Sequence, residues 1–274
     1  MPLGAFLLAL AAAALHAGWN VALAGAQNTR AATAGALALV AVVSLPLAAL
    51  TWDVDARALP FAAASVALET AYFVLLAAAY ARADLGVVYP IARGIAPVLV
   101  LAGAAVAGRG DATAVQVAGV VLVAAGVVLL RGGAAPAAGR DVALALGVGA
   151  TIAGYVVADD AGLEHAATIP YLCIVVGVPG ALYSATFAAR TGTAALRAQI
   201  GLRTAAIAVA MAGAFGLALA ALELADPAPV AAIRESSVVI AALLAPRLLA
   251  EKGGRARLAG AAAVFAGVAA VAAG

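Results

Sequence analysis

Ten apolar runs follow one another along this chain, and they restrict its fold more than any other feature. A helix needs about 20 mostly apolar residues to cross a hydrocarbon layer roughly 30 Å thick. Strands of a membrane barrel are about ten residues long and alternate in polarity, so runs of this length argue against them. We therefore predict an all-α integral membrane protein with ten transmembrane helices. The runs cover residues 3–25, 32–51, 59–81, 84–107, 113–130, 141–158, 168–188, 203–224, 228–250 and 257–273.

Composition agrees with a chain surrounded by lipid. The chain is 67% hydrophobic and 10% charged, whereas charged residues make up about a quarter of an ordinary soluble protein. Its formal net charge is +2, and the few basic residues sit mostly between the apolar runs. We therefore expect the lipid bilayer, and no nucleic acid, among its partners.

Motifs for catalysis and metal binding are missing from the sequence. It contains no G-x-x-x-x-G-K-[ST] segment that would indicate an attached ATPase, and no recognisable Ser/His/Asp arrangement. The two histidines lie far apart, and the single cysteine, Cys173, sits inside an apolar run, so the spacing offers no metal site. We expect neither an enzyme nor a cofactor or metal.

An internal repeat relates the two halves of the chain. Three positions recur at one spacing: Arg93 as Arg234, Gly119 as Gly260, and Gly126 as Gly267. The glycines lie two helical turns apart in each half, which predicts a close-packing stripe. Each half holds five spans, an odd number, so the second half enters the membrane from the opposite side. We predict two inverted-topology repeats, residues 1–133 and 134–274, a plan that recurs in secondary transporters.

Among the ionisable residues inside the predicted spans, Arg93, Arg234, Glu69 and Glu235 carry the clearest functional signal. A charged side chain at a helix centre costs roughly 2.5–3.5 kcal/mol even on the gentler insertion scales, so such residues face the bundle interior. A guanidinium offers a planar fork suited to carboxylate or phosphate, which predicts a substrate with an anionic group. The alternative is that the two acids neutralise the two arginines in fixed, purely structural ion pairs.

Several other polar and aromatic residues complete the predicted site. Because low dielectric disfavours a charged carboxylate, Glu69 and Glu235 are the proton-coupling candidates, against the alternative of permanently paired acids. Two hydroxyls, Ser236 and Ser237, are expected to bond their own i−4 carbonyls, while Asp159, Asp160 and Glu223 are expected to lie solvated at the interface. The remaining candidates for substrate binding are His16, Trp19, Asn20, Tyr72, Tyr89 and Tyr155.

Three segments resemble EamA-type members of the drug/metabolite transporter superfamily: residues 16–20 (HAGWN), 83–97 (ADLGVVYPIARGIAP) and 229–243 (PVAAIRESSVVIAAL). The resemblance covers the whole chain and implies a multi-pass plasma (inner) membrane carrier with a central cavity. Such carriers are typically exporters of amino acids, related metabolites or drugs, often driven by protons. It assigns Tyr89, Arg93, Arg234 and Glu235 to the cavity. One departure is Gly108-Arg109, where members commonly carry a Gly-Glu pair.

Together these features predict a secondary active transporter, expected to be an exporter, of a small anionic or zwitterionic metabolite. It would work by alternating access around a cavity between the repeats, and the sequence is compatible with a homodimer. The alternative is a non-transporting scaffold or sensor whose buried charges are structural. Orientation stays open, because loops after odd-numbered spans carry eleven Lys or Arg against two on the other side. That count puts both termini outside, whereas the resemblance implies that both are cytoplasmic.

Overall fold

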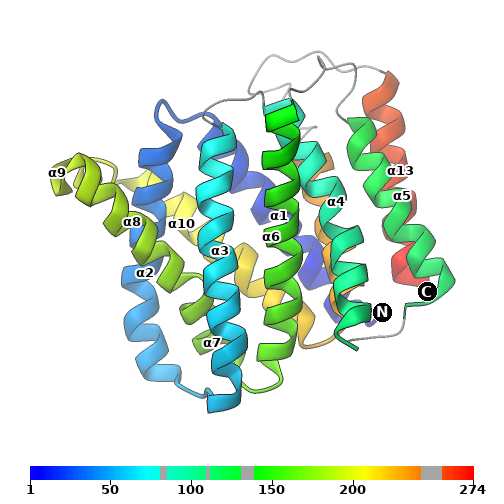
Figure 1. Ribbon diagram of the computed structural model, residues 1–274, viewed down its shortest axis with the longest axis horizontal. Helices are drawn as coiled ribbons and strands as arrows, with labels where there is room; N and C mark the ends of the chain where they lie inside the picture. Colours follow the sequence, from blue (N-terminus) through cyan, green and yellow to red (C-terminus); the bar gives the residue numbers. More distant parts are fainter. Residues whose placement is uncertain (81–84, 109–111, 131–138, 242–254) are drawn as a thin grey trace.

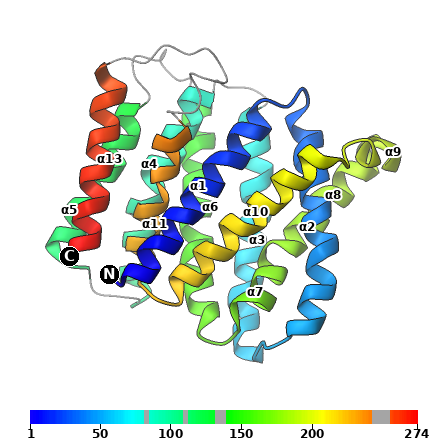
Figure 2. The same cartoon turned by 180° about the vertical axis from the view of Figure 1, so that it is seen from behind.

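The computed structural model describes residues 1–80, 85–108, 112–130, 139–241 and 255–274. Every regular element in these ranges is helical, arranged as a bundle of roughly upright and tilted helices (Figures 1 and 2). The elements are α1 (Leu3–Ala24), α2 (Thr29–Thr51), the 3-10 turn η1 (Ala56–Ala58), α3 (Leu59–Tyr80), α4 (Leu85–Val106), α5 (Ala114–Leu130), α6 (Gly139–Leu163), α7 (Thr168–Val175), α8 (Gly177–Thr191), α9 (Thr193–Arg197), α10 (Leu202–Leu222), α11 (Pro227–Arg234) and α13 (Arg255–Ala273).

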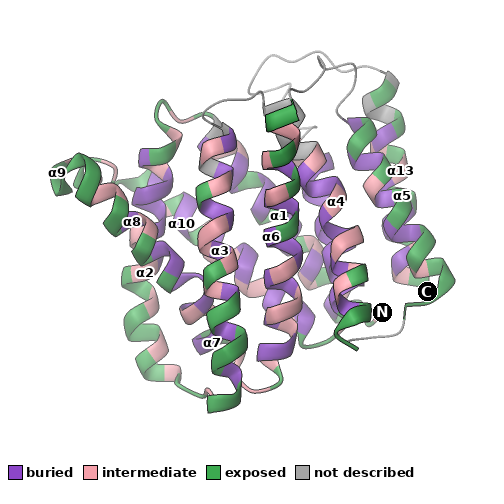
Figure 3. Cartoon of the chain, viewed as in Figure 1, coloured by how far each residue is buried: buried purple, intermediate pink, exposed green. Residues whose placement is uncertain are grey.

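Six helical stretches in the described residues are long and apolar enough to cross a membrane. They correspond to α1, α2, α3, α6, α10 and the α7–α8 pair, and shorter apolar stretches lie in α4, α5 and α13. Exposed large apolar side chains such as Leu45, Val106 and Val209 lie on the outer faces, where Figure 3 shows exposed residues around a buried interior. The architecture is that of an all-α membrane protein.

Two predicted spans are interrupted, which corrects the expectation of continuous helices. The span over 168–188 is divided at Val176, because Pro179 cannot donate a backbone hydrogen bond to Val175. The span over 228–250 is interrupted at Glu235, where the Glu235 amide donates to the Ala232 carbonyl at 3.2 Å in a tight i−3 turn. Helix resumes over residues 236–241, and the rest of this span lies outside the described residues.

Glycines bring the backbones of α5 and α13 together. A Cβ added at Gly126 would lie 2.8 Å from the Gly260 carbonyl oxygen, and one added at Gly119 would lie 2.8 Å from the Gly267 carbonyl oxygen. The predicted repeat pairs Gly119 with Gly260 and Gly126 with Gly267. The observed contacts are crossed relative to this pairing, because Gly119 meets Gly267 and Gly126 meets Gly260. Other helices pack in the same crossed way, since α1 packs on α10 and α3 packs on α6. The predicted repeat pairs α1 with α6 and α3 with α10.

Two loops meet at one end of the bundle. The Asp55 amide donates to the His165 carbonyl and the Ala167 amide donates to the Asp53 carbonyl, both at 2.9 Å. The Arg57 side chain hydrogen-bonds Asp55 and lowers the pKa of that exposed carboxyl to about 2, so the pair stays charged at any physiological pH. Both chain termini lie toward this end, where the N-terminal amine donates to the Ala272 carbonyl at 3.3 Å.

Candidate functional site

Arg93 on α4 is held by a fixed set of partners. Its Nε lies 3.1 Å from Oε2 of Glu235 in an ion pair, although the N–H is poorly aligned for a hydrogen bond. Its Nη2 donates to Ser237 Oγ at 3.0 Å and to the Arg234 carbonyl at 3.4 Å. The Arg93 side chain is only 4% exposed. The guanidinium therefore binds across the interruption after α11 and uses a carbonyl at that break.

Arg234, which the predicted repeat pairs with Arg93, has a different environment. It ends α11 and exposes 4% of its surface. Its Nε and one NH2 nitrogen have no hydrogen-bond partner in the protein. It lies within electrostatic range of Glu69 on α3 and of Tyr155 and Asp159 on α6. Arg234 is thus a buried cation with acids nearby. We call its N–H groups that lack a hydrogen-bond partner its open donor positions.

Glu69 is the acid that faces this cation from α3. It is fully buried, and neither carboxylate oxygen has a hydrogen-bond partner. One turn along α3, Tyr72 meets Tyr155 of α6 with ring centroids 6.0 Å apart in an edge-to-face arrangement. The Tyr155 hydroxyl is also buried without a hydrogen-bond partner. Helices α3 and α6 therefore present an acid and two phenols to the interior.

Helix α1 adds two rings and a side-chain amide to this buried cluster. The rings of His16 and Trp19 pack edge to face with centroids 4.8 Å apart, and both ring nitrogens of His16 and the Trp19 indole nitrogen lack hydrogen-bond partners. Asn20 donates instead to the His16 carbonyl at 2.8 Å. His16 lies within electrostatic range of both Arg93 and Arg234, so α1 faces the same cluster.

Nine of the ten predicted site residues are therefore buried, and the contacts above link them around the two arginines. The tenth, Tyr89, lies on α4, and its side chain is outside the described residues. Most of the open positions are hydrogen-bond donors, whereas Glu69 supplies acceptors. Buried polar groups in proteins are nearly always paired, so this arrangement suits a ligand with an anionic end and a cationic end. Within the described part of the chain, no group of three His, Cys, Asp or Glu residues could hold a metal ion.

The structure corrects the expectation for Asp159 and Ser237. Asp159 is not interfacial: it exposes 2% of its surface and accepts a hydrogen bond from the Tyr171 hydroxyl at 3.3 Å. The reason is that α6 continues to Leu163, beyond the predicted end at residue 158. The Ser237 hydroxyl accepts from Arg93, and the Ser236 hydroxyl has no hydrogen-bond partner, so the expected i−4 bond of Ser236 is wrong. The order of polar and apolar residues in the sequence does not indicate the contact between Asp159 and Tyr171 or the contact between Ser237 and Arg93.

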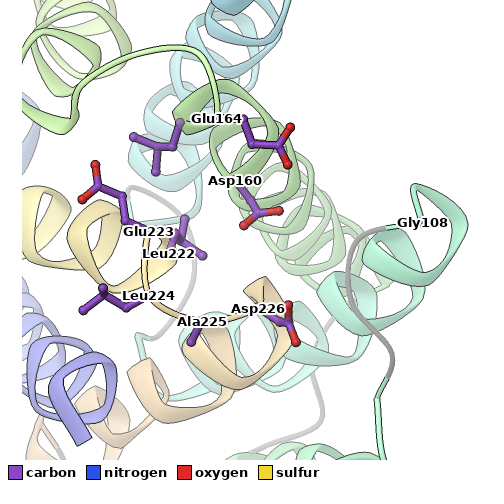
Figure 4. Close-up of a pocket in the computed structure, with 9 residues that line it drawn as sticks. Gly108, Asp160, Glu164, Leu222, Glu223, Leu224, Ala225 and Asp226 are labelled. Atoms are coloured by element: carbon purple, nitrogen blue, oxygen red, sulfur yellow. The ribbon is translucent and has the colours of Figure 1, made fainter. Parts of the chain in front are cut away.

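A cavity of about 650 Å³ opens at the helix ends, away from the center of the predicted site. Its wall includes four carboxylates, Asp160 and Glu164 from the end of α6 and Glu223 and Asp226 between α10 and α11. Figure 4 shows these side chains around the mouth of the cavity, and we call it the acidic cavity. Asp160 and Glu223 therefore lie at a solvent-reachable edge, as expected.

Comparisons with known proteins identify the fold alone. No family model matches the sequence, and no curated protein matches it. Fifteen chains of solved structures do match. One of them, described only as the crystal structure of a protein, superposes with a TM-score of 0.81 over 98% of this chain and 96% of that chain. Sequence identity is 18%, so the similarity is one of architecture.

Proposed function

We propose that this protein is an EamA-type secondary transporter that exports a small zwitterionic or anionic metabolite across the plasma (inner) membrane. In this proposal the chain crosses the membrane ten times as two inverted repeats, 1–133 and 134–274. The reciprocal contacts of Gly119 with Gly267 and of Gly126 with Gly260 support the duplication, because a twofold relation produces paired exchanges of this kind.

The observation that carries the proposal is the open donor positions of Arg234. A guanidinium buried at 4% exposure, with two nitrogens lacking hydrogen-bond partners, is costly unless a ligand supplies an anion. A substrate carboxylate matches its fork. The indole N–H of Trp19, which is also without a partner, adds a donor in the same buried region.

Glu69 supplies the means of coupling. Its carboxylate has no hydrogen-bond partner and can take either a proton or the ammonium group of a zwitterion. Binding of one excludes the other, which is the competition that proton–substrate exchange requires. The enclosure of the cluster fits one stage of an alternating-access cycle.

A scaffold or sensor is the second candidate, and one contact favours it. Arg93 and Glu235 form the fixed pair that a purely structural role requires. This pair locks α4 to the interruption after α11 and neutralises the Arg93 charge without a ligand. The two candidates therefore differ over Arg234, not over Arg93.

The first test measures flux in proteoliposomes loaded with a mixture of radiolabelled amino acids and organic acids. An inward proton gradient should accelerate efflux of at least one compound through the wild-type protein. Arg234→Gln should lower that efflux by roughly 10- to 100-fold, the loss expected for a charge-assisted hydrogen bond. The control is Arg190→Gln, which removes an exposed arginine at the end of α8.

Wild-type flux through folded Arg234→Gln protein would remove Arg234 from substrate binding. An absence of flux for every compound, with normally folded protein, would favour the scaffold or sensor.

A further inference from the structure

Asp159 is a buried acid that the proposed transport cycle does not yet use. It lies on α6, exposes 2% of its surface, and accepts a hydrogen bond from Tyr171 on α7. Burying a carboxylate costs free energy, so we expect Asp159 to have a role. It lies between the acidic cavity and Glu69, where it could carry protons from one to the other.

Asp159 is connected to the acidic cavity through its own helix. Leu163 lines the cavity and lies four residues after Asp159, so both side chains occupy one face of α6. The neighbouring Asp160 also lines the cavity and lies within electrostatic range of Asp159. The solvent-reachable space therefore ends about one helical turn from this carboxyl group.

On its other side, Asp159 faces α3. Ser65 and Glu69 lie four residues apart on one face of that helix and are both fully buried. The Ser65 hydroxyl approaches Asp159, although it forms no hydrogen bond of regular geometry. Glu69 and Asp159 interact electrostatically. The titratable and charged groups facing Asp159 are Glu69 from α3, Tyr171 from α7, Arg234 from α11, and Tyr155 and Asp160 from α6 itself.

We propose that Asp159 carries protons between the acidic cavity and Glu69. Hydronium in the cavity gives a proton to the Asp159 carboxylate and leaves as water. The neutral Asp159 then passes a proton to the Glu69 carboxylate, directly or through the Ser65 hydroxyl, which accepts one proton and releases another. Asp159 returns to its charged form, Glu69 becomes neutral, and Arg234 keeps its charge throughout. The inference deepens the proposed coupling role of Glu69 and rests on it.

The test follows carboxyl protonation by time-resolved infrared spectroscopy after a rapid pH drop, with the protein in lipid nanodiscs and no substrate present. The protonated carboxyl band of Glu69 is identified by its loss in Glu69→Gln. Asp159→Asn should slow the rise of this band by roughly a hundredfold, as expected for removal of a positioned proton-transfer group. After a drop to a pH low enough to protonate Glu69 fully, the final amplitude should be unchanged. Asp159→Glu should restore most of the rate. Asp141→Asn, at the opposite end of α6, is the matched control and should behave as wild type.

A second measurement follows the wild-type protein and uses the variant only to assign the Asp159 signal. With carbon-13 in the aspartate carboxyls, the protonated Asp signal that is absent from Asp159→Asn should rise in the wild-type protein no later than the Glu69 signal. An unchanged rate in Asp159→Asn, a Glu69 signal that precedes the Asp159 signal, or a Glu69 band that never forms would each overturn the proposal. Because no substrate is used, failure here is distinct from absence of flux in proteoliposomes.

Discussion

At the scale of single residues, two arginines at equivalent positions of the predicted repeat have different roles. Arg93 is neutralised by Glu235 at 3.1 Å, whereas Arg234 has open donor positions. An arginine cannot lose its proton inside a protein, but a buried acid can take one up. Removing Glu235 therefore leaves the Arg93 charge buried without a counter-ion. Removing Arg234 leaves Glu69 and Asp159 without this cation, but each of these acids can take up a proton and become neutral.

This difference predicts opposite effects on stability. Glu235→Gln should lower the free energy of unfolding by about 3 kcal/mol, because it leaves the Arg93 charge buried without its counter-ion. Arg234→Gln should cost much less, since Glu69 and Asp159 can bind protons in its absence. Denaturant unfolding in mixed micelles measures both. Equal losses in the two variants would contradict the assignment of a fixed pair and an open cation.

At the scale of helices, small residues decide how closely neighbours pack. Lipid supplies no hydrophobic drive between membrane helices, so backbone approach at glycines carries much of the association. At Gly126 an added Cβ would lie 2.7 Å from the Val264 backbone nitrogen and 2.8 Å from the Gly260 oxygen. Both contacts are to backbone, which cannot rotate away as a side chain would.

Gly126→Ala should therefore force α5 and α13 apart and reduce stability by about 1–3 kcal/mol, the usual cost of overpacking. Gly18→Ala is the matched control, because Gly18 also lies in a helix and has nothing within 4 Å of an added Cβ. This control should be neutral or stabilising by up to about 1 kcal/mol, since alanine favours helix over glycine. Thermal unfolding in detergent compares the two. If both variants unfold at the wild-type temperature, the glycine contact does not hold these helices.

The helices and the buried charges could be predicted from sequence because both follow from local composition. Apolar length alone placed α1 and α2 to within a few residues, and the cost of a charge in lipid marked Arg93 and Glu69 as interior. The interruption at Glu235 could not be predicted, because Arg93 from a distant helix takes the carbonyl beside it. Asp159 was missed because hydropathy falls before α6 ends, so a buried residue had the signature of an interfacial one.

At the scale of the whole molecule, the two ends of the bundle differ in charge. Around the end that bears both termini lie Asp53, Asp55, Asp160, Glu164, Glu223 and Asp226, with the single described arginine Arg57 among them. The described residues toward the other end include Arg30, Arg140, Arg190, Arg197 and Arg203. Because basic loops stay in the cytoplasm, this asymmetry predicts that the acidic cavity opens to the outside.

Cysteine labelling in intact cells tests that orientation. Replacing the one native cysteine by Cys173→Ala gives a background for Asp53→Cys at the acidic end and Gln27→Cys at the basic end, both exposed positions. A membrane-impermeant maleimide should label Asp53→Cys directly and Gln27→Cys only after permeabilisation. The reverse pattern would agree with the resemblance to carriers that keep both termini in the cytoplasm. Export driven by protons requires that protons enter the carrier from the outside. If the acidic cavity opens to the outside, Asp159 lies on the side from which these protons come. The orientation therefore decides whether the proposed proton route agrees with the proposed direction of transport.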